Sequence, residues 1–505
     1  MTQTLGSFPG GLKLAGQKKR STQTPIRKML LSKTLVLPLQ QHIGESAVAI
    51  VKVGDKVLKG QKIAAANGHV SVCLHAPSSG IITAIDERPV PHPSGLSAPC
   101  ISIETDGDDR WVERTITEDF QQLSAHDLRQ RIREAGIVGL GGAGFPSFIK
   151  LNPGIHHHVE TLILNGVECE PYITCDDMIM RERAQGIMDG IEIMQQALHV
   201  KNCVIAIEDN KPEAIAAMEL ALASREQLTS TKVVVIPTLY PTGSEKQLIQ
   251  VITGKQVPTR GLTLDIGIVL HNVGTAYAIG RAIKYGEPLI SRIVTVTGTD
   301  VKHAGNFETL FGTPIHELLA FCDTKRQAGE PFILGGPMMG YNLAGDKLPV
   351  TKTANCILAG VDDAAQLRKP LPCIRCGDCA KACPVSLLPQ QLYWHSRAKD
   401  LEKTSEYNLF DCIECGCCSY VCPSEIPLVQ YFRFAKTETM NQEQERQKSD
   451  LARIRHDNRQ DRQERERLEK EEKQQKRKAA LAASKAAKEK EAKTAEPKID
   501  TQEKQ

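Results

Sequence analysis

Two stretches of this 505-residue chain repeat one cysteine pattern. The first reads Cys373-Ile-Arg-Cys376-Gly-Asp-Cys379-Ala-Lys-Ala-Cys383-Pro384, and the second reads Cys412-Ile-Glu-Cys415-Gly-Cys417-Cys418-Ser-Tyr-Val-Cys422-Pro423. In the spacing C-x2-C-x2-C-x3-C-P, three cysteines hold three corners of a [4Fe–4S] cluster, and the fourth ligates the other cluster of the pair. The repeat therefore predicts two clusters that exchange their fourth ligands.

The predicted ligands form two sets of four, and Cys417 is out of phase and predicted to be a non-ligand. Zinc sites use four ligands in two pairs, often with histidine, and disulfides require an exported chain. Two matched sets that each close on proline fit both alternatives poorly. The first cluster is assigned Cys373, Cys376, Cys379 and Cys422, and the second Cys412, Cys415, Cys418 and Cys383.

Composition excludes several classes of protein. Met1–Gly11 has no apolar segment typical of a signal peptide, and no run of eighteen apolar residues predicts a membrane span. We therefore expect the sixteen cysteines to lie in a reducing compartment. Residues 1–440 carry 44 basic and 45 acidic side chains, so we expect no nucleic-acid partner. Residues 441–505 carry 19 basic and 15 acidic side chains.

A basic lead, residues 1–30, precedes short strands with turn signals in residues 31–106. Val51–Ile63 and His75–Ile81 resemble the biotinyl/lipoyl barrel-sandwich fold. Carrier domains of that family hold a modifiable lysine at a hairpin tip, where this chain has Asn67-Gly68-His69. We expect an unmodified scaffold domain.

The rest of the chain is predicted to be multidomain, α/β followed by smaller modules. Residues 107–285 alternate helical patterns with β-branched apolar runs such as Cys203–Ile207, which favours a Rossmann-like parallel sheet covered by helices. Residues 286–360 predict a small α+β module with a helix at Ile315–Phe321. Residues 361–435 hold the cysteine repeat, and residues 436–505 predict a solvated charged helix that frays into disorder.

The glycine-rich loop of residues 139–144 is the sharpest feature of the α/β region. Its backbone can approach a phosphate or dinucleotide closely because Gly139, Gly141, Gly142 and Gly144 lack side chains. Lys150 lies just beyond and could supply a positive charge. The alternative interpretation is a tight turn between packed elements, with Lys150 in a surface salt bridge.

Gly139–Lys150 and Asn165-Gly-Val-Glu-Cys-Glu-Pro-Tyr172 resemble the FMN- and NADH-binding subunit of respiratory complex I. Tyr240-Pro-Thr-Gly-Ser-Glu245 and Asn272-Val-Gly-Thr275 match that family too. Val167 stands where the family has aspartate, so flavin contacts there must differ. The resemblance implies a cofactor site of Gly139, Gly141, Gly142, Gly144, Phe145, Lys150, Asn165, Glu168, Glu170, Tyr240, Gly243, Glu245, Asn272 and Thr275.

The order of modules resembles the C subunit of the Rnf/Rsx ion-translocating electron transport complex: barrel-sandwich hybrid, FMN domain, β-grasp-like module, bacterial 2[4Fe-4S] ferredoxin-like domain and charged tail. The resemblance covers about residues 31–435 and implies a translocase subunit that takes electrons from NADH. It further implies integral and peripheral partner subunits at the cytoplasmic face of the bacterial inner membrane.

Two other functions stay open at this point. One is a flavin-free iron–sulfur subunit that only transfers electrons, and the other is a non-redox zinc-binding adaptor whose charged tail carries its function. Glu170 and Glu245 are candidates for contacts to NADH or the flavin ring, with helix capping or surface exposure as the alternative. We expect His156-His157-His158 to lie in a solvated loop, and no Ser/His/Asp constellation predicts hydrolytic catalysis.

Overall fold

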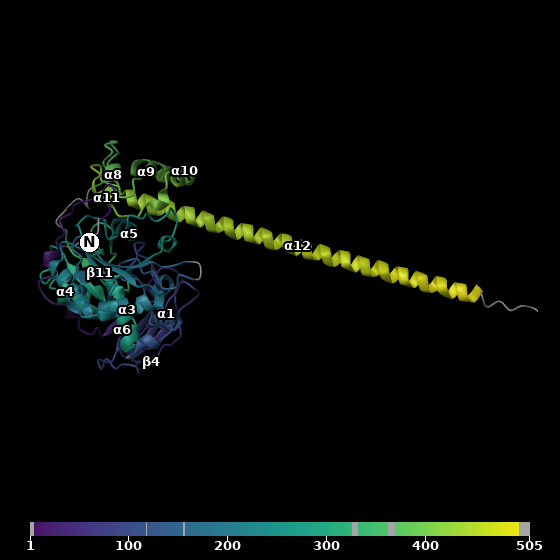
Figure 1. The fold of residues 1–505 in the computed structure, drawn as a ribbon, viewed down its shortest axis with the longest axis horizontal. Coiled ribbons are helices and arrows are strands. Elements are labelled where there is room, and N and C mark those ends of the chain that lie inside the picture. The colour runs from purple at the N-terminus through teal and green to yellow at the C-terminus, as the bar shows by residue number, and fades with distance from the viewer. Residues whose placement is uncertain (1–4, 118, 155–156, 326–331, 362–368, 494–505) are drawn as a thin grey trace, which may run out of the picture. The chain divides into compact units, whose positions relative to one another are not determined.

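The computed structural model describes residues 5–117, 119–154, 157–325, 332–361 and 369–493 (Figure 1). The chain divides into two compact units, residues 1–433 and residues 434–505. Within the first unit, the described strands form four sheets of six, four, four and three strands.

A four-stranded parallel sheet lies at the centre of the α/β region, in the order β11-β10-β9-β12. Strands β9, β10 and β12 are mostly buried apolar runs, as expected for strands covered on both faces, whereas the edge strand β11 is partly exposed. The chain moves from β9 outward to β10 and β11, then returns to place β12 on the other side of β9. The bounds are β9 Thr161–Gly166, β10 Asn202–Glu208, β11 Thr231–Ile236 and β12 Ile268–Asn272.

Helices cover both faces of this sheet. Leu162 and Leu164 of β9 share a core with α1, α3, α4 and α6, whereas Ile163 points to the opposite core, which contains α5. Helices α3 and α6 lie side by side (Figure 1) because Gly190 of α3 leaves room for the backbone of Ala276. The bounds are α1 Ala125–Glu134, α2 Ser147–Lys150, α3 Cys175–Leu198, α4 Pro212–Ala223, α5 Glu245–Thr253 and α6 Val273–Tyr285.

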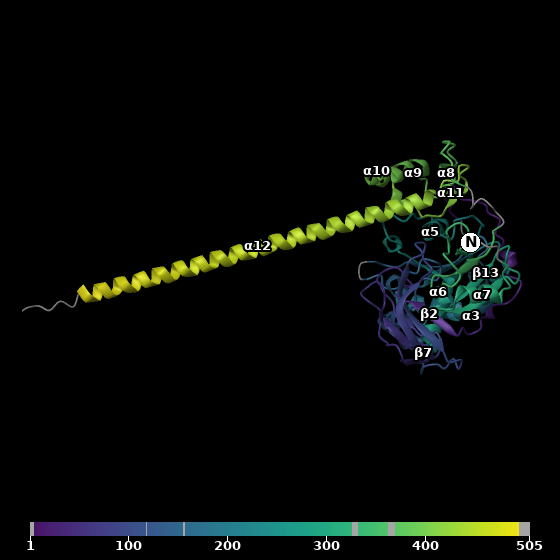
Figure 2. The same ribbon diagram turned by 180° about the vertical axis from the view of Figure 1, so that it is seen from behind.

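Residues 34–105 form two antiparallel sheets, β2-β8-β7-β4 (β2 and β7 are labelled in Figure 2) and β3-β5-β6. Both sheets contribute to one core, through residues such as Leu35, Ile63 and Ile82. The tip between β5 and β6 packs on the α/β region: Arg133 donates to the Gly68 carbonyl at 3.1 Å, and His69 meets the Phe148 ring edge-on. The bounds are β2 Thr34–Pro38, β3 Val48–Ala49, β4 Lys56–Val57, β5 Lys62–Ala65, β6 Leu74–His75, β7 Gly80–Pro89 and β8 Ser97–Thr105.

A mixed six-stranded sheet, β1-β14-β13-β17-β15-β16, carries α7 (Figure 2). Its edge strand β1 comes from the N-terminal lead, since Arg27 and Lys28 pair with Phe307 and Glu308 of β14. The sequence pattern did not predict this pairing. The bounds are β1 Arg27–Lys28, β13 Ser291–Thr297, β14 Gly305–Leu310, α7 Ile315–Phe321, β15 Ile333–Leu334, β16 Tyr341–Asn342 and β17 Cys356–Leu358.

Short helices surround the cysteine repeat, and one long helix continues the chain beyond it. The prediction of a helix for the charged tail is confirmed as far as Lys493; the predicted fraying beyond it lies outside the described residues. Of the helices in the described ranges, none has the length and apolar character needed to cross a membrane. The bounds are α8 Asp378–Lys381, α9 Pro389–Ala398, α10 Leu401–Glu406, α11 Cys417–Tyr420 and α12 Leu428–Lys493.

Candidate electron-transfer site

The eight predicted cluster cysteines gather around two cavities. One is lined by Cys383 together with Cys412, Cys415 and Cys418, and the other by Cys422 together with the three leading cysteines of the first motif. The fold thus brings each fourth cysteine to the other motif, as the exchanged assignment requires. A thiol-only donor set fits iron–sulfur clusters.

Two left-handed residues shape each cysteine loop in the same way. Arg375 and Gly377 have φ values of 58° and 84°, and Glu414 and Gly416 have 58° and 81°. Helices α8 and α11 begin directly after these glycines. The two loops therefore share one backbone conformation, which turns the leading cysteines of each motif toward its own cavity.

Cys417, the predicted non-ligand, is fully buried and does not line either cavity. It packs with Tyr240 and Ala382, and its side-chain hydrogen bond lowers the pKa of the neighbouring Cys415 thiol. Tyr240 donates its phenol hydrogen to the Cys415 carbonyl at 2.5 Å. The α/β region thus touches the loop of the second predicted cluster directly.

The residues predicted to hold a flavin lie at the carboxyl edge of the parallel sheet. Asn165, the next-to-last residue of β9, lies opposite Asn272 at the end of β12. The strand order reverses between these two strands, and open α/β sheets bind ligands at such a switch point. Asn272 caps α6 through the N–H groups of Gly274 and Thr275.

The glycine-rich loop closes over this edge. Gly139 donates its N–H to the Phe145 carbonyl at 2.8 Å, and Leu140 donates to Oγ1 of Thr275 at 2.9 Å. Buried Arg292 donates to the Leu140 carbonyl at 2.9 Å. These bonds hold the loop against the start of α6.

Two observations indicate that the glycine-rich loop can hold a cofactor with a phosphate group. A side chain at Gly142, where φ is 111°, would point into space with no protein atom within 4 Å. Within the described residues, the N–H groups of Gly141, Gly142 and Ala143 have no protein acceptor. Such N–H groups are the donors that a phosphate uses. Gly141 faces Asn272, and Gly144 is confined by Thr353.

Lys150 and Glu245 are paired with each other. The Lys150 ammonium donates to Glu245 at 2.8 Å and to the Leu270 carbonyl at 3.3 Å, and both side chains are about one third exposed. Glu245 is the first residue of α5. The salt-bridge interpretation of Lys150 is therefore correct in geometry, although the pair stays accessible to a charged ligand.

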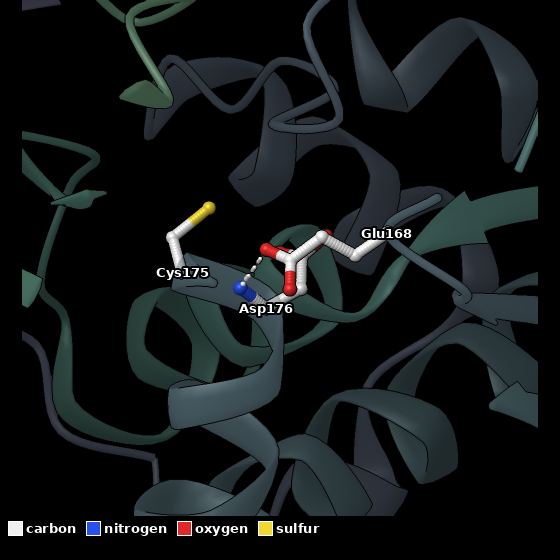
Figure 3. A group of neighbouring side chains, drawn as sticks. All are labelled: Glu168, Cys175 and Asp176. Carbon is white, nitrogen blue, oxygen red and sulfur yellow. Dashed lines mark hydrogen bonds between the residues drawn. The ribbon is translucent and has the colours of Figure 1, made fainter. Parts of the chain in front are cut away.

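Glu168 caps the start of α3 through both oxygens. One accepts from the N–H of Asp176 at 2.7 Å (Figure 3), and the other accepts from the N–H of Asp177 at 3.2 Å. Asn272 donates to the Asp176 carboxyl at 2.6 Å. Burial and the nearby Glu168 raise the pKa of Asp176 to about 7. Glu168, Cys175 and Asp176 place possible metal-ligand atoms within 4.8 Å of one another, but both carboxyls are already engaged in this capping network.

Glu170 accepts from the N–H groups of Met338 and Met339 at 3.2 and 2.7 Å. Removal from water raises the pKa of its carboxyl to about 7. Gly336 is required in this turn because a side chain there would overlap the Glu170 carboxyl. Glu170 therefore connects the predicted flavin region to the six-stranded module by hydrogen bonds.

The Asn165–Tyr172 segment is fixed from several sides. Asn165 donates to the Gly243 carbonyl at 2.8 Å, and Gly243 is packed against Cys169. Val167, at the position where the resembled family has aspartate, is fully buried, and its carbonyl accepts from buried Lys211 at 2.7 Å. This position therefore offers a flavin no carboxylate.

Sequence reasoning missed four residues that organise the site: Lys18, Asp176, Lys211 and Arg292. The Lys18 ammonium donates to the carbonyls of Glu168, Glu170 and Ile173 at 2.7–3.1 Å, although it lies about 150 positions earlier in the chain. No local spacing signals such long-range contacts. His157 is exposed and contacts the Pro153 carbonyl and Asp265, while His156 lies outside the described residues.

Comparison with protein families agrees with this domain order. Residues 6–108 match the RnfC barrel sandwich hybrid domain, residues 132–281 the Nuo51 FMN-binding domain, and residues 372–426 the 4Fe-4S dicluster domain. The fold and site thus define an iron–sulfur protein with an FMN-binding domain.

The chain belongs to the family of the C subunit of the ion-translocating oxidoreductase complex. It is 50% identical to the family member of Pseudomonas aeruginosa over 90% of this chain and 58% of that protein, and 50% identical to that of Serratia proteamaculans over 85% and 61%. The Haemophilus influenzae (strain PittEE) protein is 46% identical over 90% of this chain and 70% of its own length. The chain thus spans about three fifths of the first two relatives.

Proposed function

We propose that this chain is the electron-input subunit of a membrane-bound, ion-translocating NADH:ferredoxin-type oxidoreductase, and that electrons pass between NADH, FMN and two [4Fe–4S] clusters. The hydrogen bond from Tyr240 to the Cys415 carbonyl carries the proposal, because it joins the loop between β11 and α5, at the carboxyl edge of the parallel sheet, to one cysteine cavity within a single unit. The family of the chain supports the same assignment.

Each part of the site has a distinct task in this proposal. Bound FMN would supply the exchange between a two-electron hydride and single electrons. The N–H groups of Gly141, Gly142 and Ala143 would hold its phosphate, and Asn165 and Asn272 would orient it at the switch point. Lys150 and Glu245, paired and partly exposed, contact the nicotinamide dinucleotide at the mouth of the site.

The second cluster is the one nearer the flavin in this proposal. Tyr240 and Met338 cover its loop, whereas the first cluster's loop lacks such cover within the described part of the chain. Electrons that enter at the sheet edge would reach the cysteines at 412, 415, 418 and 383 first. They would then cross to the cysteines at 373, 376, 379 and 422.

We place the protein at the cytoplasmic face of the bacterial inner membrane, held there by integral and peripheral partner subunits. We further interpret the parallel-sheet domain as Rossmann-like and the six-stranded module as a β-grasp-like scaffold. The predicted domain limits, residues 31–106, 107–285, 286–360 and 361–435, remain our division of the folded body. Residues 1–30 add the strand β1 to that division.

Analysis of anaerobically purified protein tests the proposal. We expect about eight iron atoms and one FMN per chain, absorbance near 400 nm and bleaching of that absorbance by NADH. Iron without flavin would favour the second candidate function, a flavin-free subunit that only relays electrons between iron–sulfur clusters. The observation in favour of that function is Val167, which stands where the resembled family has aspartate. A colourless protein that contains zinc would overturn both assignments.

A further inference from the structure

The two cysteine loops have the same backbone but very different cover. In the second loop, Cys415 is 7% exposed and Ile413 packs against the core around Tyr240. In the first loop, the equivalent Cys376 is exposed and the equivalent Ile374 is 69% exposed. A difference in local conformation cannot explain this contrast, because the positive φ values of the two loops agree within a few degrees.

The paired glycines show what causes the difference. A side chain at Gly416 would collide with the Met338 carbonyl at 2.7 Å, because the body of the protein lies directly on that loop. A side chain at Gly377 would meet no atom of the described part of the chain within 4 Å. The second loop is therefore packed on a protein surface, whereas the first loop has the same shape and no such surface against it among the residues that the structure describes.

The bare loop belongs to a wider apolar face. Leu371 is 63% exposed and Pro423 is exposed, and the two are held beside each other by Ser424, which accepts from the Leu371 N–H and donates to the Pro372 carbonyl, each at 2.9 Å. We call this surface the exposed cluster face; it consists of Leu371, Ile374, Arg375, Cys376 and Pro423. Apolar residues gathered around an exposed ligand position mark an interaction site.

The charges around this face favour an acidic partner. Lys369 and Arg375 are exposed, whereas Asp378 is paired with Lys381 at 3.0 Å. The covered loop has Glu414 where the bare loop has Arg375, and Glu414 is paired with Arg433 of the same unit at 2.8 Å. The position that is neutralised internally in the second loop is therefore a cation presented to solvent in the first.

We propose that the exposed cluster face is the docking surface for a second redox protein, with an apolar centre, an acidic rim and a one-electron centre of its own. This protein covers the first loop as Tyr240 and Met338 cover the second. The inference rests on the proposed function and deepens it by assigning the site at which electrons leave the chain. One electron would leave the first cluster, which is thereby oxidised, and would reduce the partner's centre.

Photocrosslinking in the assembled complex tests the face without changing its charge. Benzoylphenylalanine at Ile374 is expected to crosslink to a subunit that carries an iron–sulfur, flavin or haem centre, and benzoylphenylalanine at Leu220, which is 76% exposed on α4, is not. A crosslink from position 374 to a second copy of this chain, to lipid or to a subunit without a redox centre overturns the proposal.

A matched pair of leucine variants measures the electron transfer. Leu371→Glu and Leu220→Glu each place a carboxylate at an exposed leucine. The probe is membrane that contains the other subunits, prepared from cells lacking this chain. We expect Leu371→Glu to slow NADH-driven reduction of the membrane's redox centres at least tenfold, and Leu220→Glu to leave the rate unchanged. We also expect the wild-type rate to fall as salt is raised.

A second measurement separates failure of this inference from failure of the proposed function. NADH-driven bleaching of the chain's own iron–sulfur absorbance, measured without membranes, reports only internal transfer. If bleaching is absent in the wild type, the proposed function is wrong. If bleaching is normal in both variants and Leu371→Glu still reduces the membrane centres at the wild-type rate, the docking surface is wrong.

Discussion

Tyr240 and Cys415 are 175 positions apart in the chain, yet the Tyr240 phenol donates to the Cys415 carbonyl at 2.5 Å. The tyrosine is 2% exposed and lies where the flavin-type domain meets the second cysteine loop. Burial raises the pKa of its phenol far above the ordinary value, so the group remains a donor at any physiological pH. This bond is a direct structural link between the two predicted redox regions.

Tyr240→Phe should leave iron and flavin contents unchanged but weaken this link. The variant leaves a buried carbonyl without its donor, a cost of about 1–3 kcal/mol. We expect NADH-driven cluster reduction, followed by stopped-flow absorbance, to slow several-fold. Tyr341→Phe is the matched control, since the Tyr341 phenol also donates to a backbone carbonyl, that of Pro91, and Tyr341 lines neither cysteine cavity. Equal rates in both variants would show that the link has no role in transfer.

Cys383→Ala should remove the cluster held by Cys412, Cys415 and Cys418, because Cys383 lines the same cavity. Cys422→Ala should remove the other cluster. We expect each variant to retain about half of the iron and one of two reduced-cluster EPR signals, and the lost signal should differ between them. Cys417→Ala should retain both signals. Loss of the same signal in Cys383→Ala and Cys422→Ala would contradict the exchanged ligation.

Gly142→Val should abolish flavin retention, because the added side chain would enter the open space next to Gly142, where we place the flavin phosphate. Gly54→Val is the control: Gly54 also has a positive φ, 94°, and open space, but it lies in the barrel-sandwich region. Both variants carry similar backbone strain. The measurement is FMN released per chain after gel filtration, and equal flavin in the two variants would exclude the loop as the binding site.

Lys352 should make stability depend on pH above neutrality. Burial lowers the pKa of its ammonium from 10.5 to about 7, while it donates to the carbonyls of Gly136 and Cys73. At a pH between these two pKa values, Lys352 holds a proton in the unfolded chain that it has released in the folded protein. The free energy of unfolding therefore rises with pH in this range, by at most about 1.4 kcal/mol per pH unit.

Lys352→Met removes this titration. The melting temperature of the wild type, relative to that of the variant, should therefore rise from pH 7 toward pH 10. Lys33→Met, at a side chain that is 86% exposed, should show no such trend. A constant difference between wild type and Lys352→Met across this range would mean that the lysine keeps its proton when buried.

Deletion of residues 441–505 should leave clusters, flavin and NADH oxidation intact. These residues belong to the second structural unit, and their described side chains are almost all exposed. Their charges nearly balance and they include no aromatic anchor for a membrane surface. In cells that contain the partner subunits, most of the shortened protein should stay in the membrane fraction. Complete release into the soluble fraction would identify the tail as the anchor.

The sequence by itself determined the features that depend on neighbours along the chain. The limits predicted for the helix Ile315–Phe321 are confirmed, because a helix depends on residues three and four positions apart. The cysteine spacing predicted the grouping that lines the two cavities, since three ligands of each set lie within seven residues. Ligation itself stays a prediction.

Only the tertiary structure decided which distant groups meet. Lys18 reaches the Glu168–Ile173 segment, Lys150 pairs with Glu245, and β1 joins β14. It also decided that, of two cysteine loops with the same backbone conformation, one is covered and the other is bare within the described residues. The physical reason is that burial and long-range hydrogen bonds depend on which surfaces pack together, and no local periodicity or motif spacing records that choice.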